Sequence, residues 1–306
     1  RELWTFHQLK HSLQESKKKY LFVGLGTMGY PMAGHLSKNK DFDLYVYNRT
    51  DEVADKWLNK HDGSKFIFNN SSNIKFHGLI TCLKDDNSII DVLVNKKLLS
   101  YLTKNSFIID HSTTSLELID KINSNQNVIG NNISFFDAPI SGGQVGAENG
   151  SLSVMFGGPG NKISTINKIM SSYSSSIIKI GPSGHGQLTK MVNQLCIAGL
   201  LQGLSEGMAL GMKRELNMNK VFDAISKGAA QSWQMDNRFK TMVQGQFDFG
   251  FAVDLMIKDL KIALKESGNA SLDLNIAKAV LKNYKKLSED DDGNLDTSSL
   301  IKNLKT

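Results

Sequence analysis

The sequence predicts an α/β fold: a Rossmann-type, doubly wound parallel sheet, followed by an all-α C-terminal domain that a long helix joins to it. Two observations predict it. From residue 20 to about 180, short apolar runs alternate with helical patterns, as in a parallel sheet covered by helices on both faces. From about 186 to 306, strand signals fade and apolar residues recur at helical spacing.

The chain has 306 residues, a length that suits two domains. We place their boundary at the turn Gly181-Pro182-Ser183-Gly184, so the sheet domain covers 20–182 and the helical domain covers 183–306. Residues 1–19 precede the first expected strand and carry five basic residues against two acidic ones. We interpret them as a basic N-terminal extension.

Six short runs are expected to form strands, and several of them end in a polar residue or a glycine. Ligands of such sheets bind outside the carboxyl ends of the strands, so a site is expected at these endings. The expected strands are 20–23, 43–47, 79–83, 107–110, 134–137 and 152–156.

The most informative stretch is the first strand and the turn after it. An apolar run, Tyr20–Val23, leads directly into Gly24, Gly26 and Gly29. By themselves three spaced glycines also fit an ordinary turn, but between a strand and a helix they cradle the pyrophosphate of a dinucleotide. We therefore expect a dinucleotide-binding domain. The cofactor-binding residues predicted here are Gly24, Leu25, Gly26, Thr27, Met28 and Gly29.

The end of the second strand, Tyr47-Asn48-Arg49-Thr50, indicates which dinucleotide is bound. At the position of Asn48, an NAD-preferring site carries an acidic residue that bonds the ribose 2′-hydroxyl. Here that residue is neutral, and the Arg49 guanidinium can pair with a 2′-phosphate. We predict that Asn48, Arg49 and Thr50 favour NADP, with NAD as the alternative. In the other interpretation Arg49 is solvated and Asn48 only closes the strand.

Composition excludes some partner classes. The net charge is +6, but about half of it lies in residues 1–19 and no basic stripe with aromatic residues follows, so we expect no nucleic-acid partner. The apolar stretch Leu195–Leu204 is interrupted by Gln202 and glycines, so we expect no membrane span. Cys82 and Cys196 are interpreted as buried free thiols, which favours a cytoplasmic location. No metal site is expected.

Three further motifs carry a resemblance to a known family: 137–158, 186–194 and Lys258-Asp259-Leu260. Together with the glycine turn they resemble the β-hydroxyacid dehydrogenases, which include 3-hydroxyisobutyrate dehydrogenase, tartronate semialdehyde reductase and the glyoxylate/succinic semialdehyde reductases. The resemblance covers residues 20–305. It implies hydride transfer between NAD(P) and a small hydroxy acid or its semialdehyde, in a homodimer or homotetramer.

The resemblance implies that Lys190 is the general acid/base and that Asn193 binds the substrate. Lys190 lies on the expected long helix, and Asn193 and Gln194 follow at i+3 and i+4 on the same face. Its ammonium would donate a proton to the aldehyde oxygen. Partial burial would lower its pKa toward the working pH.

The same resemblance places other residues around the substrate and the nicotinamide. Ser141, Gly142 and Gly143 would bind the substrate carboxylate through a hydroxyl and exposed backbone N–H groups. Thr113 would lie near the nicotinamide ribose, and Lys258 would contact the cofactor. A second interpretation is local: Thr114 and Glu117 have the spacing of a capping box.

One departure from the family pattern stands out. The backbone of Leu83 would contact the cofactor, but Lys84 follows it where the family usually has Pro or Ser.

Trp233 lies in a segment with which the family varies its substrate pocket, so it either lines that pocket or belongs to a helical core. The phenylalanines of the alternating run Phe247–Phe251 are expected to pack at a domain or subunit contact.

The sequence leaves two alternative functions open. One is a 6-phosphogluconate dehydrogenase-like enzyme, although that family has His-Asn where this chain has Asn193-Gln194. The other is a non-catalytic dinucleotide-binding module, although such relatives lose the lysine that stands here at 190. The substrate and the direction of reaction are not identified.

Overall fold

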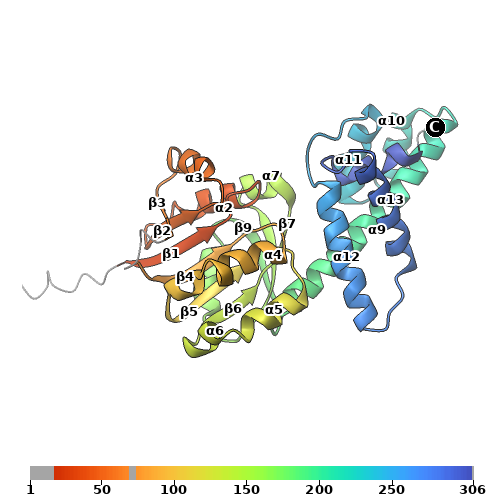
Figure 1. Ribbon diagram of the computed structural model, residues 1–306. Helices are drawn as coiled ribbons and strands as arrows, with labels where there is room; N and C mark the ends of the chain where they lie inside the picture. The colour runs from red at the N-terminus through yellow and green to blue at the C-terminus, as the bar shows by residue number, and fades with distance from the viewer. Residues whose placement is uncertain (1–16, 69–73, 305–306) are drawn as a thin grey trace, which may run out of the picture.

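The computed structural model describes residues 17–68 and 74–304. Figure 1 shows a sheet domain and a helical domain, with helix α9 (His185–Lys213) running from the first into the second. The last strand ends at Gly181, so the element types change on the two sides of Pro182.

One nine-stranded sheet forms the first domain, in the order β3-β2-β1-β4-β5-β6-β8-β7, with β9 paired to β8. Pairs from β3 to β6 are parallel, while β8 runs antiparallel to β6 and β7. The strands are β1 Lys18–Val23, β2 Phe42–Tyr47, β3 Ser64–Lys65, β4 Phe76–Thr81, β5 Leu102–Asp110, β6 Ser134–Asp137, β7 Ile140–Ser141, β8 Leu152–Gly157 and β9 Ser174–Gly181.

All six expected strands are present, with shifted ends, and three were not expected. β1 begins at Lys18, two residues inside the segment interpreted as an extension. The sheet is mostly parallel, as expected, and β8 adds antiparallel pairing with β6 and β7. The strand β9 was missed because its sequence, SSSIIKIG, begins with three serines and is largely exposed at the sheet edge, so it shows no apolar alternation.

Helices cover both faces of the sheet, as alternation along the strands requires. In β1, Phe22 faces one core while Leu21 and Val23 face the other. The first core lies under α2, α3, α7 and α8, and the second under α4, α5 and α6. These helices are α2 Gly29–Leu36, α3 Asp51–Leu58, α4 Asp86–Ile90, α5 Leu116–Asn123, α6 Gln126–Gly130, α7 Gly143–Glu148 and α8 Ile163–Met170, with the short turns η1 Asp91–Asn95 and η2 Leu98–Tyr101.

The N-terminus of α9 is fixed to the end of strand β6. The buried Asp137 carboxylate accepts hydrogen bonds from the backbone N–H of Gly184 (2.8 Å) and of Gln187 (3.0 Å). These N–H groups have no partner inside the helix, so the carboxylate caps it. Gly186 is required there, because a Cβ would lie 2.4 Å from the Asp137 carbonyl oxygen.

Five further elements build the helical domain around α9. The helix contributes Ala198 and Leu201 to one core with α12 and α13, and Met208 to a second core with α10 and α11. The elements are α10 Met218–Ile225, α11 Trp233–Gln244, α12 Val253–Asn269, α13 Asn275–Glu289 and η3 Thr297–Leu304.

Within the described part of the chain, α9 alone has the length and composition to cross a membrane. Its most apolar window has a mean hydropathy of 1.3, so the expectation that Gln202 and the glycines exclude such a segment is wrong. The core helix of a soluble protein passes the same test, and α9 does contribute to two cores. Yet only 28% of that window is buried, so much of its apolar surface faces outward.

Candidate active site

The glycine turn has the geometry of a dinucleotide cradle. Gly24 has a φ of +98°, and a Cβ there would lie 2.3 Å from the carbonyl oxygen of Cys82. A Cβ on Gly29 would lie 1.9 Å from the carbonyl oxygen of Gly24, so the turn closes tightly on the helix start. Around Gly26, by contrast, no other described atom comes within 4 Å of the Cβ position. The turn is therefore closed on its inner side and open where a pyrophosphate would approach.

Asn48 supports this turn from the end of β2. Its Oδ1 accepts a hydrogen bond from the backbone N–H of Leu25 (3.0 Å), and its Nδ2 donates to the Thr50 carbonyl (3.0 Å). Both side-chain atoms are thus used inside the protein, while Arg49 and Thr50 are exposed beside the turn. The predicted selectivity for NADP therefore depends on Arg49 rather than on Asn48.

The predicted nicotinamide-side residues converge from three distant segments. The Lys258 ammonium donates to the Thr113 carbonyl (2.6 Å) and pairs with Asp259 (3.0 Å). The backbone N–H of Leu83 donates to Ser112 Oγ (2.8 Å). Residues 83, 113 and 258 therefore line one region between the two domains.

The local interpretation of Thr114 is wrong. Ser115, one residue later, is the N-cap of α5 and accepts a hydrogen bond from the backbone N–H of Leu118 (3.1 Å). Glu117, the other half of the expected capping box, instead pairs with Lys265 of α12 (2.6 Å). This ion pair joins the two domains.

Lys190 is buried at the point where α9 passes the sheet edge. The residue is only 8% exposed, and its ammonium donates to the Ile140 carbonyl (2.9 Å). Burial lowers the pKa of Lys190 to about 8, a change that the charge on Asp259 opposes and the charge on Lys258 increases. A lysine that titrates near pH 8 can both hold and release a proton under physiological conditions.

The residue after Ile140 begins the predicted carboxylate site. Ser141 ends β7, and the backbone φ values of Gly142 (+129°) and Gly143 (+62°) are ones that side chains rarely allow. Gly142 and Gly143 are exposed, so their backbone groups are accessible close to the Lys190 side chain.

A hydrogen-bonded chain on the other side of Lys190 was only partly expected. Asn193 Nδ2 donates to Gln194 Oε1 (2.8 Å), and Gln194 Nε2 donates to Asp259 Oδ2 (2.7 Å). Gln194 and Asp259 are buried. Their pairing was missed, although Gln194 stands at i+4 from Lys190 and therefore shares its helix face.

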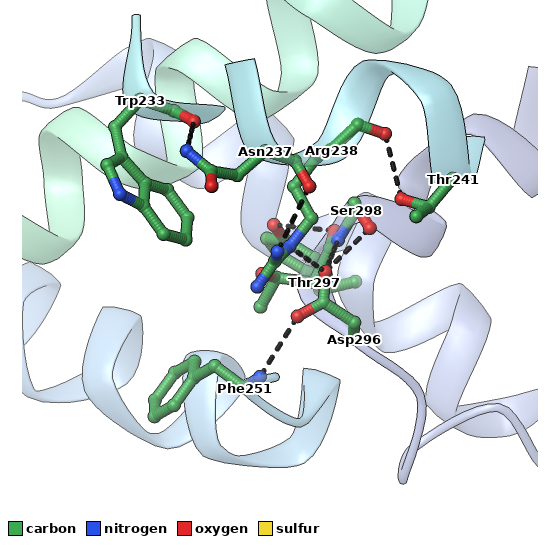
Figure 2. A network of polar contacts seen from close by, with 9 residues as sticks. Trp233, Asn237, Arg238, Thr241, Phe251, Asp296, Thr297 and Ser298 are labelled. Atoms are coloured by element: carbon green, nitrogen blue, oxygen red, sulfur yellow. Dashed lines mark hydrogen bonds and ion pairs between the residues drawn. The ribbon is translucent and has the colours of Figure 1, made fainter. Parts of the chain in front are cut away.

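Trp233 lies away from Lys190 of its own chain. Figure 2 shows its ring beside Arg238 and the polar contacts that Arg238 makes with Asp296. The guanidinium carbon lies 5.0 Å from the Trp233 ring centre and 4.9 Å from that of Phe249. Helix α11, which carries Trp233 and Arg238, packs on Met208. Met208 lies about 27 Å along α9 from Lys190 at 1.5 Å per residue. The Trp233 ring is 56% exposed, so it belongs neither to a core nor to its own chain's site.

The comparisons with known proteins divide the chain at the same place. Residues 19–181 match the model of the NAD-binding domain of 6-phosphogluconate dehydrogenase. Residues 184–304 match the model described as NAD-binding of NADP-dependent 3-hydroxyisobutyrate dehydrogenase. Together the two models span almost all of the described chain.

Whole-chain relatives agree. An uncharacterized oxidoreductase of Shewanella frigidimarina is 43% identical, with 94% of this chain and 98% of the relative covered. The 2-(hydroxymethyl)glutarate dehydrogenase of Eubacterium barkeri is 31% identical, with 84% of this chain and 86% of the relative covered. The fold is also that of Mycobacterium tuberculosis 3-hydroxyisobutyrate dehydrogenase solved with L-serine, with a TM-score of 0.84 and 22% identity. That comparison covers 95% of this chain and 100% of the solved chain. This chain therefore belongs to the β-hydroxyacid dehydrogenase family, the NAD(P)-dependent oxidoreductases that act on the CH–OH group of small hydroxy acids.

Proposed function

We propose that this protein interconverts a small 3-hydroxy acid and its semialdehyde, using NADP, with Lys190 as general acid/base. The observation that carries the proposal is the buried Lys190 ammonium, with a pKa of about 8, bonded to the Ile140 carbonyl immediately before Ser141–Gly143. Burial and a shifted pKa are typical of a catalytic lysine rather than of a surface lysine.

The relatives named above favour one substrate unit. The names 3-hydroxyisobutyrate and 2-(hydroxymethyl)glutarate, and the L-serine of the solved structure, share a CH2–OH group next to a carboxylate-bearing carbon. They differ only in the other group on that carbon. In this chain Ser141, Gly142 and Gly143 would bind the carboxylate, while Lys190 would face the hydroxyl or aldehyde oxygen.

The protein's residues divide the work around the bound cofactor, which supplies or accepts the hydride. In reduction, the Lys190 ammonium donates its proton to the aldehyde oxygen; in oxidation, the free amine takes the hydroxyl proton. The Asn193 amide, held by Gln194, fixes the substrate oxygen. The backbone of the glycine turn, with Leu83, Thr113 and Lys258, positions the cofactor.

A 6-phosphogluconate dehydrogenase-like activity is the weaker candidate. The matching model from that enzyme covers only the dinucleotide-binding half, whereas the helical half matches the 3-hydroxyisobutyrate dehydrogenase model. A non-catalytic module is disfavoured because Lys190 is buried at the centre of the predicted site.

We also propose that the protein is a homodimer or homotetramer that pairs through one face of α9. On this face Val192 and Leu210 are 60% and 65% exposed. At Gly199, Gly203 and Gly207, no described atom lies within 4 Å of the Cβ position. Small residues at these positions would let another helix pack closely, and none of the described helices of the same chain fills that space. A second copy would cover this apolar surface.

The enzymatic proposal is tested by following NADPH absorbance with a panel of semialdehydes. Each carries its aldehyde and its carboxylate on the same carbon, and the panel varies only the other group on that carbon. Aldehydes without a carboxylate serve as controls for the Ser141–Gly143 site. Reduction of the acids but not of the controls supports the proposal. Equal rates for both groups, or turnover of 6-phosphogluconate alone, would overturn it.

A further inference from the structure

Gln187 joins three parts of the site that the sequence places far apart. It lies in the first turn of α9, three residues before Lys190, and its side chain is fully buried. Its Oε1 accepts a hydrogen bond from the Thr114 backbone N–H (3.1 Å), and its Nε2 donates to the Ser112 carbonyl (2.7 Å). Its backbone N–H donates to the Asp137 carboxylate. One residue therefore ties the ends of β5 and β6 to the helix that carries Lys190.

The segment that Gln187 holds, residues 112–114, supports the two nicotinamide-side contacts. Ser112 Oγ accepts from the Leu83 N–H, and the Thr113 carbonyl accepts from the Lys258 ammonium. The Gln187 amide bonds the backbone on both sides of Thr113. If it were removed, a buried carbonyl and a buried N–H would lose their partners, which the backbone can recover only by moving toward water.

We propose that Gln187 is a positioning residue: its amide fixes residues 112–114 against α9 and thereby sets the separation of the Lys258 and Lys190 ammonium groups. The proposal rests on the proposed function, because it assigns Gln187 a role in that same site. Gln187 does not reach the substrate. It acts through Thr113 and Lys258 on one side and through the start of α9 on the other.

The sign of the electrostatic effect follows from the charges around Lys190. The Asp259 carboxylate raises the pKa of Lys190, and the Lys258 charge lowers it. When residues 112–114 loosen, Lys258 loses its carbonyl anchor and keeps only its ion pair with Asp259, so its ammonium can move away from Lys190. The pKa of Lys190 then rises, and in the reduction direction the protonated acid persists to higher pH. The basic limb of the pH–rate profile should therefore shift upward.

Two variants separate hydrogen bonding from packing. Gln187→Met keeps an unbranched side chain of similar length without the amide. Gln187→Glu keeps the shape and the acceptor for Thr114 but sets an oxygen against the Ser112 carbonyl. The matched control is Ser205→Ala on the same helix, where the residue is fully buried and its Oγ has no hydrogen-bond partner in the part of the chain that the structure describes.

The readouts are NADPH affinity by fluorescence titration, the pH profile of reduction, and Tm. We expect both Gln187 variants to weaken NADPH binding about tenfold or more, because residues 112–114 lose buried hydrogen bonds that hold the Leu83 and Lys258 contacts. We expect Gln187→Met also to raise the basic limb. Ser205→Ala should change neither. A Lys258→Met background should abolish the pH shift that Gln187→Met causes, because the two residues act together.

The outcomes are distinguishable. A lower Tm for the Gln187 variants, with wild-type NADPH affinity and an unmoved pH profile, would reduce Gln187 to a structural residue and overturn the proposal. If instead no semialdehyde is reduced by the wild type, the proposed function fails, while the NADPH titration still decides the role of Gln187. If Gln187→Met does not fold, the NADPH affinity of Gln187→Glu carries the comparison.

Discussion

Gln194 and Asp259, 65 residues apart in the chain, form a buried hydrogen bond of 2.7 Å that joins α9 to α12 directly behind the predicted site. The same carboxylate pairs with Lys258 through its other oxygen. Asp259 is therefore shared between the residue that orients Asn193 and the lysine that contacts Thr113. Its charge also raises the pKa of Lys190, against the effect of burial.

Asp259→Asn should shift the pH dependence of reduction to the acid side. The asparagine amide can still accept the Gln194 hydrogen bond, but the negative charge that raises the Lys190 pKa is lost. Lys190 then releases its proton at lower pH, so the basic limb of kcat against pH moves downward. Asp273→Asn removes the same charge at an exposed site and should leave the profile unchanged. An unmoved limb in the Asp259 variant contradicts this coupling.

Lys190→Met should slow both directions of the reaction by about 10²- to 10⁴-fold, the usual contribution of a general acid/base. In the wild type, reduction should decline as pH rises through about 8, and oxidation should decline as pH falls through about 8, because the two directions need opposite protonation states. Both limbs should disappear in the variant. NADPH titration checks that the variant still binds cofactor, so that a rate loss cannot be attributed to an empty site.

Arg49→Glu should reverse the cofactor preference. A carboxylate there repels a 2′-phosphate and can bond a ribose hydroxyl, so kcat/KM for NADPH should drop about tenfold or more while that for NADH holds or improves. The control is Lys104→Glu, which reverses the charge of an exposed residue near the start of strand β5. The predicted site lies beyond the other end of that strand. Unchanged selectivity in Arg49→Glu would mean that Arg49 is simply solvated.

The parts of the site that the sequence predicts are those that a continuous segment encodes. The turn at Gly24–Gly29 needs only its own glycines and the strand before it. Its spacing can therefore be recognised in the sequence without knowledge of the rest of the fold. The start of α9 is similarly local, because the turn before it and the helical pattern after it are adjacent. Here pattern and structure agree to within a residue or two.

The parts that the sequence does not predict depend on which segments meet. A glutamine such as Gln187 or Gln194 has the same local pattern whether it faces solvent or a buried backbone, and only the fold decides. The N-cap of α5 is a smaller case. Thr114 and Ser115 are both residue types that cap helices well. Ser115 is the cap here because it also bonds Asp86 of α4, a contact between distant segments that a local sequence pattern cannot show.

Asp110→Asn should stabilise the protein above about pH 6. Burial raises the pKa of Asp110 from 3.8 to about 6, and its Oδ2 has no hydrogen-bond partner among the described residues. Because the folded-state pKa is the higher one, the wild type loses stability as pH rises from about 4 to about 6. The difference corresponds to roughly 3 kcal/mol at most at neutral pH. An asparagine can keep the bonds from Thr81 and Ser112 without the charge.

Thermal unfolding of this variant at pH 4 and pH 8 tests the effect. Its Tm advantage over the wild type should be present at pH 8 and shrink at pH 4, where the wild-type carboxyl is already protonated. Asp43→Asn, at an exposed position of β2, should show no pH-dependent difference. A Tm of Asp110→Asn below that of the wild type at pH 8 would show that the charge is needed in the folded state.

The outward face of α9 gives the last prediction, a loss of assembly without a loss of folding. Leu210 and Leu272 are 65% and 58% exposed, so neither side chain contributes much to its own chain's core. Leu210→Lys places a charge on the face that Gly203 and Gly207 leave open, whereas Leu272→Lys lies in the turn between α12 and α13. Only the first should reduce the mass measured by light scattering, while both variants should keep the helix content of the wild type by circular dichroism. Cys196, on the same face, is exposed in the protomer, so the expectation that it is buried is wrong. It offers an independent check, since a second copy there should make it less reactive toward thiol reagents in the wild type than in Leu210→Lys. Equal masses for the two lysine variants would move the interface to another surface.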